Sequence, residues 1–263
     1  MQMQNYLQPD SLEEAYSVLN QREENVIIAG GTLLTRGDRR VNTGIDVAAL
    51  LSSEVTREGG NVRIGAMTSF ETLRIKAGMV QPESAAILRK VLEIGGVQLR
   101  NQITIGGTVC SKWGTSWLNT MLLALDAELD FYHSGVIPIS EYFRSGYSKD
   151  ILLSISIKAQ MLCKCEGTAA FVSVGGQTML NTVIAQSTEG FRVAVGGRPG
   201  IAVRLTEAEN ILNKAGATED AITELQKIQA PELFGGDLCA SKEYRTAICG
   251  SLIAEAAEKY YED

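Results

Sequence analysis

Two copies of the tripeptide Gly-Gly-Thr constrain the fold of this chain most, because each one ends a short apolar run, within residues 26–32 and 103–108. Paired glycines have no Cβ atoms, so their backbone N–H groups are accessible to an anionic group. The chain has seven Gly-Gly pairs, and only these two combine a preceding hydrophobic strand pattern with a following threonine. Two strand-ending turns of this kind can hold one diphosphate between them.

Composition sets the size of the core and the nature of the partners. With 263 residues, 45% of them hydrophobic, the chain can bury a large core and suits two modest domains. Its net charge of -7 disfavours nucleic acid and anionic membranes as partners. No apolar stretch reaches the roughly 20 residues that cross a bilayer, and no secretory signal pattern opens the sequence, so we expect a cytoplasmic protein.

Cysteine and histidine are too few for a disulfide framework or a metal site. The five cysteines are an odd number at scattered positions, which favours free thiols in a reducing compartment. Cys163 and Cys165 flank one lysine, but there is no second thiol pair and His133 is the only histidine. These residues do not make a zinc or iron–sulfur ligand set, so we expect no metal in this chain.

Several common catalytic and nucleotide-binding motifs are absent from the sequence. It contains neither the G-x-G-x-x-G fingerprint of dinucleotide-binding folds nor the G-x-x-x-x-G-K-[ST] phosphate loop. It also lacks a G-x-S-x-G elbow and an H-E-x-x-H helix. A chain so poor in histidine is better suited to chemistry through a bound cofactor than to nucleophilic or zinc-dependent hydrolysis.

The hydrophobic patterns divide the chain into two domains of an α+β protein. In the first domain, residues 1–147, they predict a capped helix from Ser11, strands at 26–29, 45–48 and 62–66, and helices from Ser69, at 85–94 and at 118–125. In the second domain, residues 148–263, they predict an opening strand at 151–157 and further strands at 168–174, 181–186 and 191–195. Helices at 206–214 and 241–260 are expected to cover one face of that antiparallel sheet.

Short stretches in a characteristic order carry a resemblance to a known family. They are residues 29–34 paired with 100–107, followed by 122–129, 195–199 and 241–245. Together they resemble the FAD-binding medium subunits of molybdenum hydroxylases, the flavoprotein family of xanthine dehydrogenase and carbon monoxide dehydrogenase. The resemblance extends over nearly the whole chain. It implies a two-part FAD-binding domain followed by a small domain of antiparallel sheet and helices.

The resemblance also assigns residues to the cofactor. It implies that the diphosphate of FAD is wrapped by Val26, Ile27, Ile28, Ala29, Gly30, Gly31, Thr32 and Leu33. From the second side it implies contacts from Thr104, Ile105, Gly106, Gly107 and Thr108. Ile94 is expected near the flavin ring, and Leu152 is expected to pack against that ring between the two domains. The family usually has asparagine at the position of Thr108, and often an acidic residue where this chain has Trp117.

The function implied by the resemblance is electron transfer through FAD. Such a subunit takes electrons from iron–sulfur clusters on a partner chain and passes them to NAD+ or another acceptor. The resemblance implies an iron–sulfur subunit and a molybdopterin-binding subunit as partners. A partner is needed because this chain has no cysteine cluster of its own. Two alternatives stay open: a flavin-dependent oxidoreductase that acts alone, and a scaffold subunit that has lost FAD. No catalytic side chain is assigned, since a flavin carries the chemistry itself.

Overall fold

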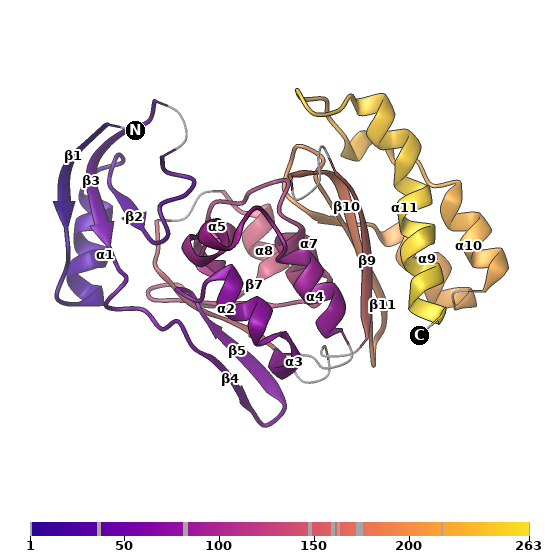
Figure 1. Cartoon of the computed structure of the whole chain (residues 1–263), viewed down its shortest axis with the longest axis horizontal. Coiled ribbons are helices and arrows are strands. Elements are labelled where there is room, and N and C mark those ends of the chain that lie inside the picture. The colour runs from indigo at the N-terminus through magenta and orange to yellow at the C-terminus, as the bar shows by residue number, and fades with distance from the viewer. Residues whose placement is uncertain are drawn as a thin grey trace.

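Three β-sheets lie along the long axis of the molecule, an N-terminal, a middle and a C-terminal sheet (Figure 1). The structure is a computed structural model that describes residues 2–35, 38–80, 84–146, 149–158, 161, 164–171, 176–216 and 218–262. The predicted boundary between residues 147 and 148 lies outside these residues, as does Cys163. The mixture of helices and antiparallel sheets confirms the predicted α+β class.

The N-terminal unit is a small parallel sheet covered by one helix. Its strands β1 (Gln2–Leu7), β3 (Arg40–Asp46) and β2 (Val26–Ile28) pair in that order, and helix α1 (Leu12–Gln21) connects β1 to β2. The predicted cap is confirmed, because the Ser11 side chain accepts a hydrogen bond from the Glu14 N–H and the Glu14 carboxylate accepts one from the Asp10 N–H. The first glycine turn follows the carboxyl end of β2 directly.

The middle unit consists of a five-stranded antiparallel sheet and several short helices. The strands, in spatial order, are β4 (Val55–Glu58), β5 (Asn61–Gly65), β8 (Leu152–Ile157), β6 (Glu128–Phe131) and β7 (Gly135–Pro138). The helices are α2 (Phe70–Ile75), α3 (Ala77–Val80), α4 (Ala85–Val91), α5 (Val97–Gln102), α6 (Ile105–Cys110), α7 (Trp117–Ala124) and α8 (Ile139–Arg144). The predicted start of α2 is confirmed, with Ser69 as its cap.

One strand belongs to a different sheet from the one that its sequence pattern suggested. The prediction for residues 151–157 was a strand that opens the second domain. The strand exists as β8, but it lies at the centre of the middle sheet, hydrogen-bonded to β5 on one side and β6 on the other. Period-two alternation reports only that a strand has two environments, and it carries no information about which distant strand becomes its neighbour.

The C-terminal unit is a four-stranded antiparallel sheet with helices on one face. Three of the strands and two of the helices were predicted, whereas the short strand 203–204 and the helix 219–226 were not. Residues 172–174 of the predicted strand 168–174 lie outside the described residues. Its strands, in spatial order, are β12 (Val203–Arg204), β11 (Gly190–Gly196), β10 (Thr178–Ser187) and β9 (Cys165–Phe171). The helices are α9 (Thr206–Ala215), α10 (Glu219–Gln226) and α11 (Lys242–Glu262), and a 3-10 turn covers Pro231–Leu233. α9 and α11 pack on this sheet, and α7 of the middle unit contacts its other face (Figure 1).

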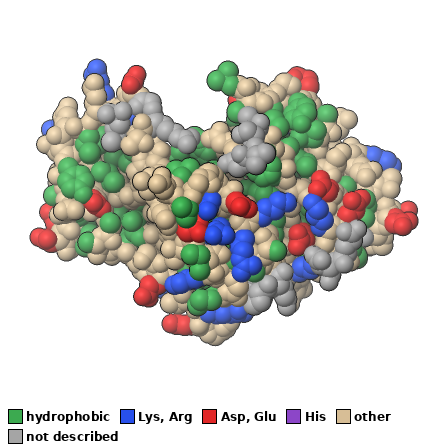
Figure 2. All heavy atoms as spheres, viewed as in Figure 1, with side chains coloured by type: hydrophobic (Ala, Val, Ile, Leu, Met, Phe, Trp, Pro, Cys, Tyr) green, Lys and Arg blue, Asp and Glu red, His purple; other side chains and the backbone are tan. Residues whose placement is uncertain are grey.

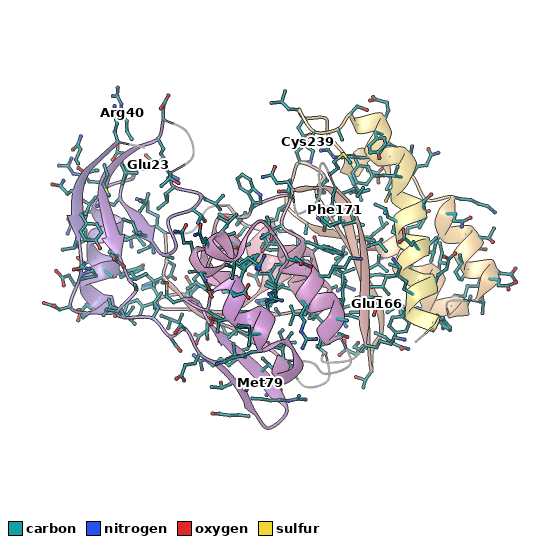
Figure 3. The ribbon with its side chains drawn as sticks, viewed as in Figure 1. Glu23, Arg40, Met79, Glu166, Phe171 and Cys239 are labelled. Atoms are coloured by element: carbon teal, nitrogen blue, oxygen red, sulfur yellow. The ribbon has the colours of Figure 1, made fainter. Side chains whose placement is uncertain are left out.

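The hydrophobic core continues from the middle unit to the C-terminal sheet. Val183 and Ala185 on β10 pack into the core of the middle unit, whereas Ile184 between them packs under α11 and its neighbours. Phe171, at the end of β9, lies on the side of the sheet that faces the middle unit (Figure 3). Because β10 is buried on both faces, the two units are joined by shared core and not by a loose linker.

The surface seen in Figure 2 has Lys and Arg side chains gathered near its centre, with hydrophobic side chains beside them. In the same view, Figure 1 draws the helices of the middle unit in this region. Within the described part of the chain, no helix is both long and apolar enough to cross a membrane.

Candidate functional site

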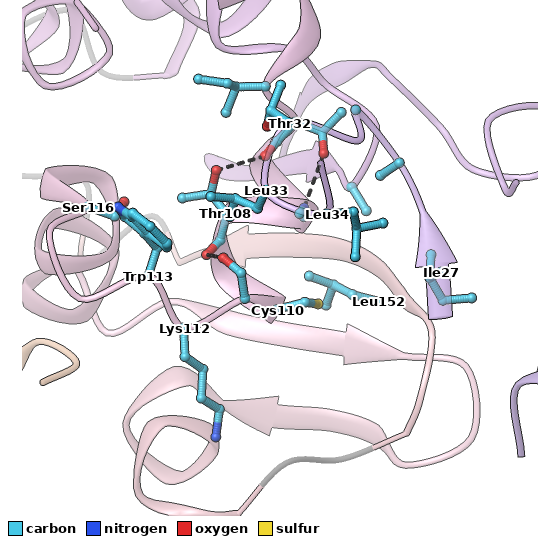
Figure 4. Close-up of a pocket in the computed structure, with 18 of the residues that line it drawn as sticks. Ile27, Thr32, Leu33, Leu34, Thr108, Cys110, Lys112, Trp113, Ser116 and Leu152 are labelled. Atoms are coloured by element: carbon cyan, nitrogen blue, oxygen red, sulfur yellow. Dashed lines mark hydrogen bonds between the residues drawn. The ribbon is translucent and has the colours of Figure 1, made fainter. Parts of the chain in front are cut away.

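A cavity of about 1090 Å³ lies where residues of all three units meet. Its wall comes from the end of α1, β2 and the following turn, the segment from α4 to the start of α7, the entry to β8, and the ends of β9 and β10. Figure 4 shows part of this wall, with Thr32 to Leu34 near Thr108 and with Cys110 near Leu152. The volume is that of a site for a large organic ligand.

The structure brings most of the sequence-predicted site residues to this one cavity. Those that line it are Val26, Ile27, Ala29, Gly30, Gly31, Thr32, Leu33, Ile94, Thr104, Gly106, Gly107, Thr108 and Leu152. Ile28 and Ile105 do not line it. Ile105 is fully buried in the core of the middle unit. The Ile28 side chain lies beside Gly44, where an added Cβ would be 2.5 Å from Ile28 Cδ1.

The first glycine turn presents backbone donors that the protein itself does not use. The N–H groups of Gly30, Gly31, Thr32 and Leu33 donate to no residue that the structure describes. Gly31 has a φ of +70°, and the turn is closed by a bond of 3.2 Å from the Thr35 N–H to the Gly31 carbonyl. Unpaired amides in a cavity wall need a ligand or water as partner, so this turn fits the predicted anion site.

The second glycine segment differs from its prediction in two ways. It does not end a strand, because Thr104 caps helix α6 and the glycines occupy the first turn of that helix. Its amides are also not bare. The N–H groups of Ile105 and Gly106 donate to carbonyls of Thr68 and Ala66, each at 2.9 Å, and the Gly107 N–H donates to Thr104 Oγ1 at 3.1 Å.

The glycines of the second segment instead allow parts of the backbone to approach closely. A Cβ on Gly106 would lie 2.7 Å from the Ala66 Cβ, closer than real Cβ atoms come to other atoms. The two segments also touch each other, since a Cβ on Gly30 would lie 1.7 Å from the carbonyl oxygen of Gln102. The paired glycines thus join two distant segments into one wall of the cavity.

Thr108 and Trp117, the two residues that depart from the family pattern, both make hydrogen bonds within the protein. Thr108 Oγ1 donates to the Thr104 carbonyl at 3.0 Å, within helix α6. Trp117 is buried, and its Nε1 donates to the Thr182 carbonyl at 3.3 Å. Its ring meets Phe171 edge-on, with centroids 6.0 Å apart, and Lys90 Nζ lies 5.7 Å from its centroid. This end of the cavity is therefore aromatic where the family often has a carboxylate.

Sequence reasoning missed three lysines, Lys90, Lys112 and Lys149, and one cysteine, Cys110, in the cavity wall. Lys112 Nζ donates to the carbonyls of Tyr142 and Ser145 at the end of α8, at 2.6 and 2.7 Å, and burial lowers its pKa. Lys149 Nζ donates to carbonyls at the end of α1. Burial raises the pKa of the Cys110 thiol to about 12, so this thiol stays protonated. No local pattern marked these residues, because their partners lie far away in the sequence.

Arg100 and His133 both have structural contacts away from the first glycine turn. Arg100 Nε is 2.6 Å from Glu71 Oε2, and its Nη1 donates to the Gly95 carbonyl at 2.7 Å. His133 is exposed and stacks on Tyr16 with ring centroids 4.9 Å apart. Among the described residues, no group of three or more His, Cys, Asp and Glu side chains is arranged to hold a metal ion.

Comparison with known proteins gives a consistent family assignment. Residues 1–158 match the family model described as the FAD binding domain in molybdopterin dehydrogenase. The uncharacterized protein YgfM of Escherichia coli strain K12 is 30% identical over 96% of this chain and 95% of that relative. The nicotine 6-hydroxylase medium subunit of Paenarthrobacter nicotinovorans is 26% identical, over 94% of each chain.

Solved structures show the same fold at lower sequence identity. Carbon monoxide dehydrogenase from Hydrogenophaga pseudoflava matches 98% of this chain and 97% of that chain, with a TM-score of 0.82 and 20% identity. Quinoline 2-oxidoreductase from Pseudomonas putida 86 matches 98% and 96% of the two chains, with a TM-score of 0.81 and 20% identity. At this level of identity, the likeness shows the fold.

Proposed function

This chain belongs to the family of FAD-binding domains of molybdopterin dehydrogenases, and on that premise we propose that it is the FAD-binding electron-transfer subunit of a molybdenum hydroxylase complex. In this role it takes electrons from iron–sulfur clusters on a partner chain and passes them to NAD+ or another acceptor. An iron–sulfur subunit and a molybdopterin-binding subunit are its proposed partners. The chain is thus one component of an oxidoreductase.

The observation that carries the proposal is the set of unpaired amides in the first glycine turn. Gly30 to Leu33 line a large cavity, and their N–H groups donate to no described residue. A diphosphate supplies acceptor oxygens for several such donors at once. The second glycine segment has a different role in the site. Its backbone packs closely against Ala66, and the first turn packs against the residue that precedes it, Gln102.

The remaining wall suits a flavin ring that is held without a covalent bond. Ile94 and Leu152 supply apolar surface, and their predicted contacts with the ring belong to this proposal. Bound FAD supplies a two-electron carrier, while the protein orients it and limits access of water. Cys110 lies in the described wall, but its raised pKa keeps the thiol protonated and makes it a poor nucleophile for a bond to the flavin.

Analysis of the purified chain for flavin and metals tests the proposal. We expect a yellow protein that releases FAD, and not FMN, into the supernatant on acid precipitation. A colourless protein favours the scaffold alternative. Flavin that stays with the pellet, or a released cofactor that proves to be FMN, contradicts the proposed binding mode.

Activity of the isolated chain separates the subunit from an enzyme that acts alone. Because the clusters and the molybdenum site are proposed to lie on partner chains, we expect little oxidation of heterocyclic or aldehyde substrates. Oxidation of NADH with an artificial dye acceptor is the expected residual activity. Full substrate turnover by the isolated, metal-free chain contradicts the subunit proposal.

A further inference from the structure

The segment from α2 to α5 carries a charge opposite to that of the rest of the chain. Residues 70–102 contain five basic and three acidic residues, whereas the remaining 230 residues contain 19 basic and 28 acidic ones. The helices of this segment contact one another on one side of the middle sheet (Figure 1). A chain with a net charge of -7 therefore presents a local positive surface.

This surface combines cations with exposed apolar side chains. We call it the basic face and define it by Arg74, Ile75, Lys76, Met79, Arg89, Lys90 and Val97. Ile75 is 68% exposed, and Met79 and Val97 are each 50% exposed. Figure 2 shows Lys and Arg side chains together with hydrophobic ones near the centre of this view, and Figure 3 places Met79 at its lower edge. Apolar side chains among cations are typical of protein interfaces.

The acidic residues of this segment offset only part of its positive charge, because three of them stand against five basic residues. Glu93 is exposed, and the ionised carboxylate of Glu71 neutralises part of the charge of Arg74 and Arg100. Glu71 is buried and pairs with both Arg74 and Arg100, each at 2.6 Å. Hydrogen bonds from Arg74 and Arg100 hold the pKa of Glu71 at about 2. Lys76 and Arg89 form no ion pair with any residue that the structure describes. Their charges are thus available to a partner.

The basic face borders the part of the cavity that is proposed to hold the flavin ring. Lys90 at the end of α4 belongs to the face and also lines the cavity, as do Glu93 and Ile94 in the loop that follows. A chain bound on this face lies next to the ring, whereas a chain bound on α9 or α10 lies at the far end of the molecule (Figure 1).

We propose that the basic face is the docking surface for an iron–sulfur protein chain with an acidic, partly apolar contact surface. The inference rests on the proposed function, because it names where the electron donor of that function binds. Two one-electron transfers from such a partner, together with two protons from water, would reduce a flavin bound in the cavity by two electrons. The excess negative charge elsewhere on this chain repels an acidic partner, so charge alone orients the encounter.

The test measures binding of a plant-type [2Fe–2S] ferredoxin, an acidic protein, to the full chain by calorimetry at low ionic strength. The variant is the double charge reversal Lys76→Glu with Arg89→Glu. Its matched control is Lys214→Glu with Lys227→Glu, which changes the net charge equally at two exposed positions on α9 and after α10. The readout is affinity and needs no activity of the flavin.

We expect the variant on the basic face to lose at least about tenfold in affinity, and the control to bind like the wild type. The difference should disappear near 1 M salt, where the Debye length is about 3 Å. A wild-type chain that does not bind the ferredoxin, or a control that loses as much affinity as the variant, overturns the inference.

Cross-linking locates the bound ferredoxin independently of mutation. A carbodiimide joins lysine amines to carboxylates in contact, and mass spectrometry identifies the lysines. Cross-links from Lys76 and Lys90 support the inference, whereas cross-links mainly from Lys214 and Lys227 overturn it. Flavin content is measured on the same sample. Docking needs no flavin, so the cross-linking result can be interpreted whether or not the sample contains flavin. A sample without flavin counts against the proposed function alone.

Discussion

At the scale of single residues, the glycines of the cavity wall have different physical roles. Gly31 needs its positive φ, and an added Cβ there would meet no atom within 4 Å. Gly30 and Gly106 need the absence of a Cβ, because backbone atoms lie within 3 Å of where it would be. The first role concerns conformation and the second concerns space, so substitutions at these positions fail for different reasons.

Replacement of Gly31 by alanine should weaken FAD binding without unfolding the chain. An alanine at this positive φ is strained by about 1–3 kcal/mol. Relaxation of that strain moves the neighbouring amides. We expect the dissociation constant for FAD, measured by flavin fluorescence, to rise at least about tenfold, which corresponds to about 1.4 kcal/mol.

Gly59 provides the matched control for this substitution. It also has a positive φ, of +57°, and open space around an added Cβ, but it lies in the turn between β4 and β5, away from the cavity. Gly59→Ala should lower the melting temperature about as much as Gly31→Ala. If it weakens FAD binding equally, the first turn has no special role in the site.

At the scale of elements, buried charges connect helices and loops that are short on their own. Glu71 on α2 holds Arg100 on α5, and the fully buried Arg245 on α11 holds the loop before that helix. Helices of six residues are not stable alone, so such contacts determine where they lie.

The stabilising effect of Glu71 should depend on pH. Hydrogen bonds from Arg74 and Arg100 lower its pKa from 4.5 to about 2, so the charged carboxylate favours the folded state. The resulting stability is complete above about pH 4.5 and is lost as the pH falls towards 2. Urea unfolding should show a difference between wild type and Glu71→Gln at pH 7 that shrinks at about pH 3. A difference that stays constant with pH speaks against the ion pairs as its cause.

Loss of the Arg245 guanidinium should strongly destabilise the C-terminal unit. It donates to the carbonyls of Met179, Gly235 and Ala240 and pairs with Asp237 at 2.7 Å. Arg245→Met leaves these acceptors without their donor, and we expect the free energy of unfolding to fall by about 3–5 kcal/mol.

The exposed Lys242, in the first turn of the same helix, is the control for Arg245. Lys242→Met should change the free energy of unfolding by less than about 0.5 kcal/mol. Both values come from chemical denaturation followed by circular dichroism. If both variants lose a similar amount of unfolding free energy, the buried contacts of Arg245 do not stabilise the C-terminal unit.

At the scale of the whole molecule, the cavity is the place where all three units meet. Its wall includes residues near α1, from the middle unit, and from the ends of β9 and β10. A ligand in this cavity therefore binds the folded arrangement of the three units and has no comparable site in the unfolded chain.

Bound FAD should stabilise the entire chain against heat. At a free FAD concentration of about 100 times the Kd, the expected stabilisation is about 2.7 kcal/mol. For a chain of this length, that raises the melting temperature of the flavin-free protein by about 5–10 °C. FMN at the same concentration should give a smaller rise, because it has one phosphate and no adenosine. Equal rises with FAD and FMN contradict the role of the diphosphate turn.

The sequence by itself determined the features that depend on neighbouring residues. Ser11 and Ser69 cap helices as predicted, because a cap needs only a hydroxyl and the amides that follow it. Three strands of the C-terminal sheet and the helices α9 and α11 were also predicted, since periodicity is a local property. The family, and with it the fold, could be recognised from short stretches in a fixed order.

Only the tertiary structure decided which distant groups meet. It placed β8 in the middle sheet and satisfied the amides of Gly106 and Gly107, whereas those of the first turn have no partner among the described residues. It also directed Ile28 and Ile105 away from the cavity. A backbone amide has the same chemistry in every Gly-Gly-Thr copy, and whether it is free for a ligand depends on carbonyls far along the chain, which no local pattern specifies.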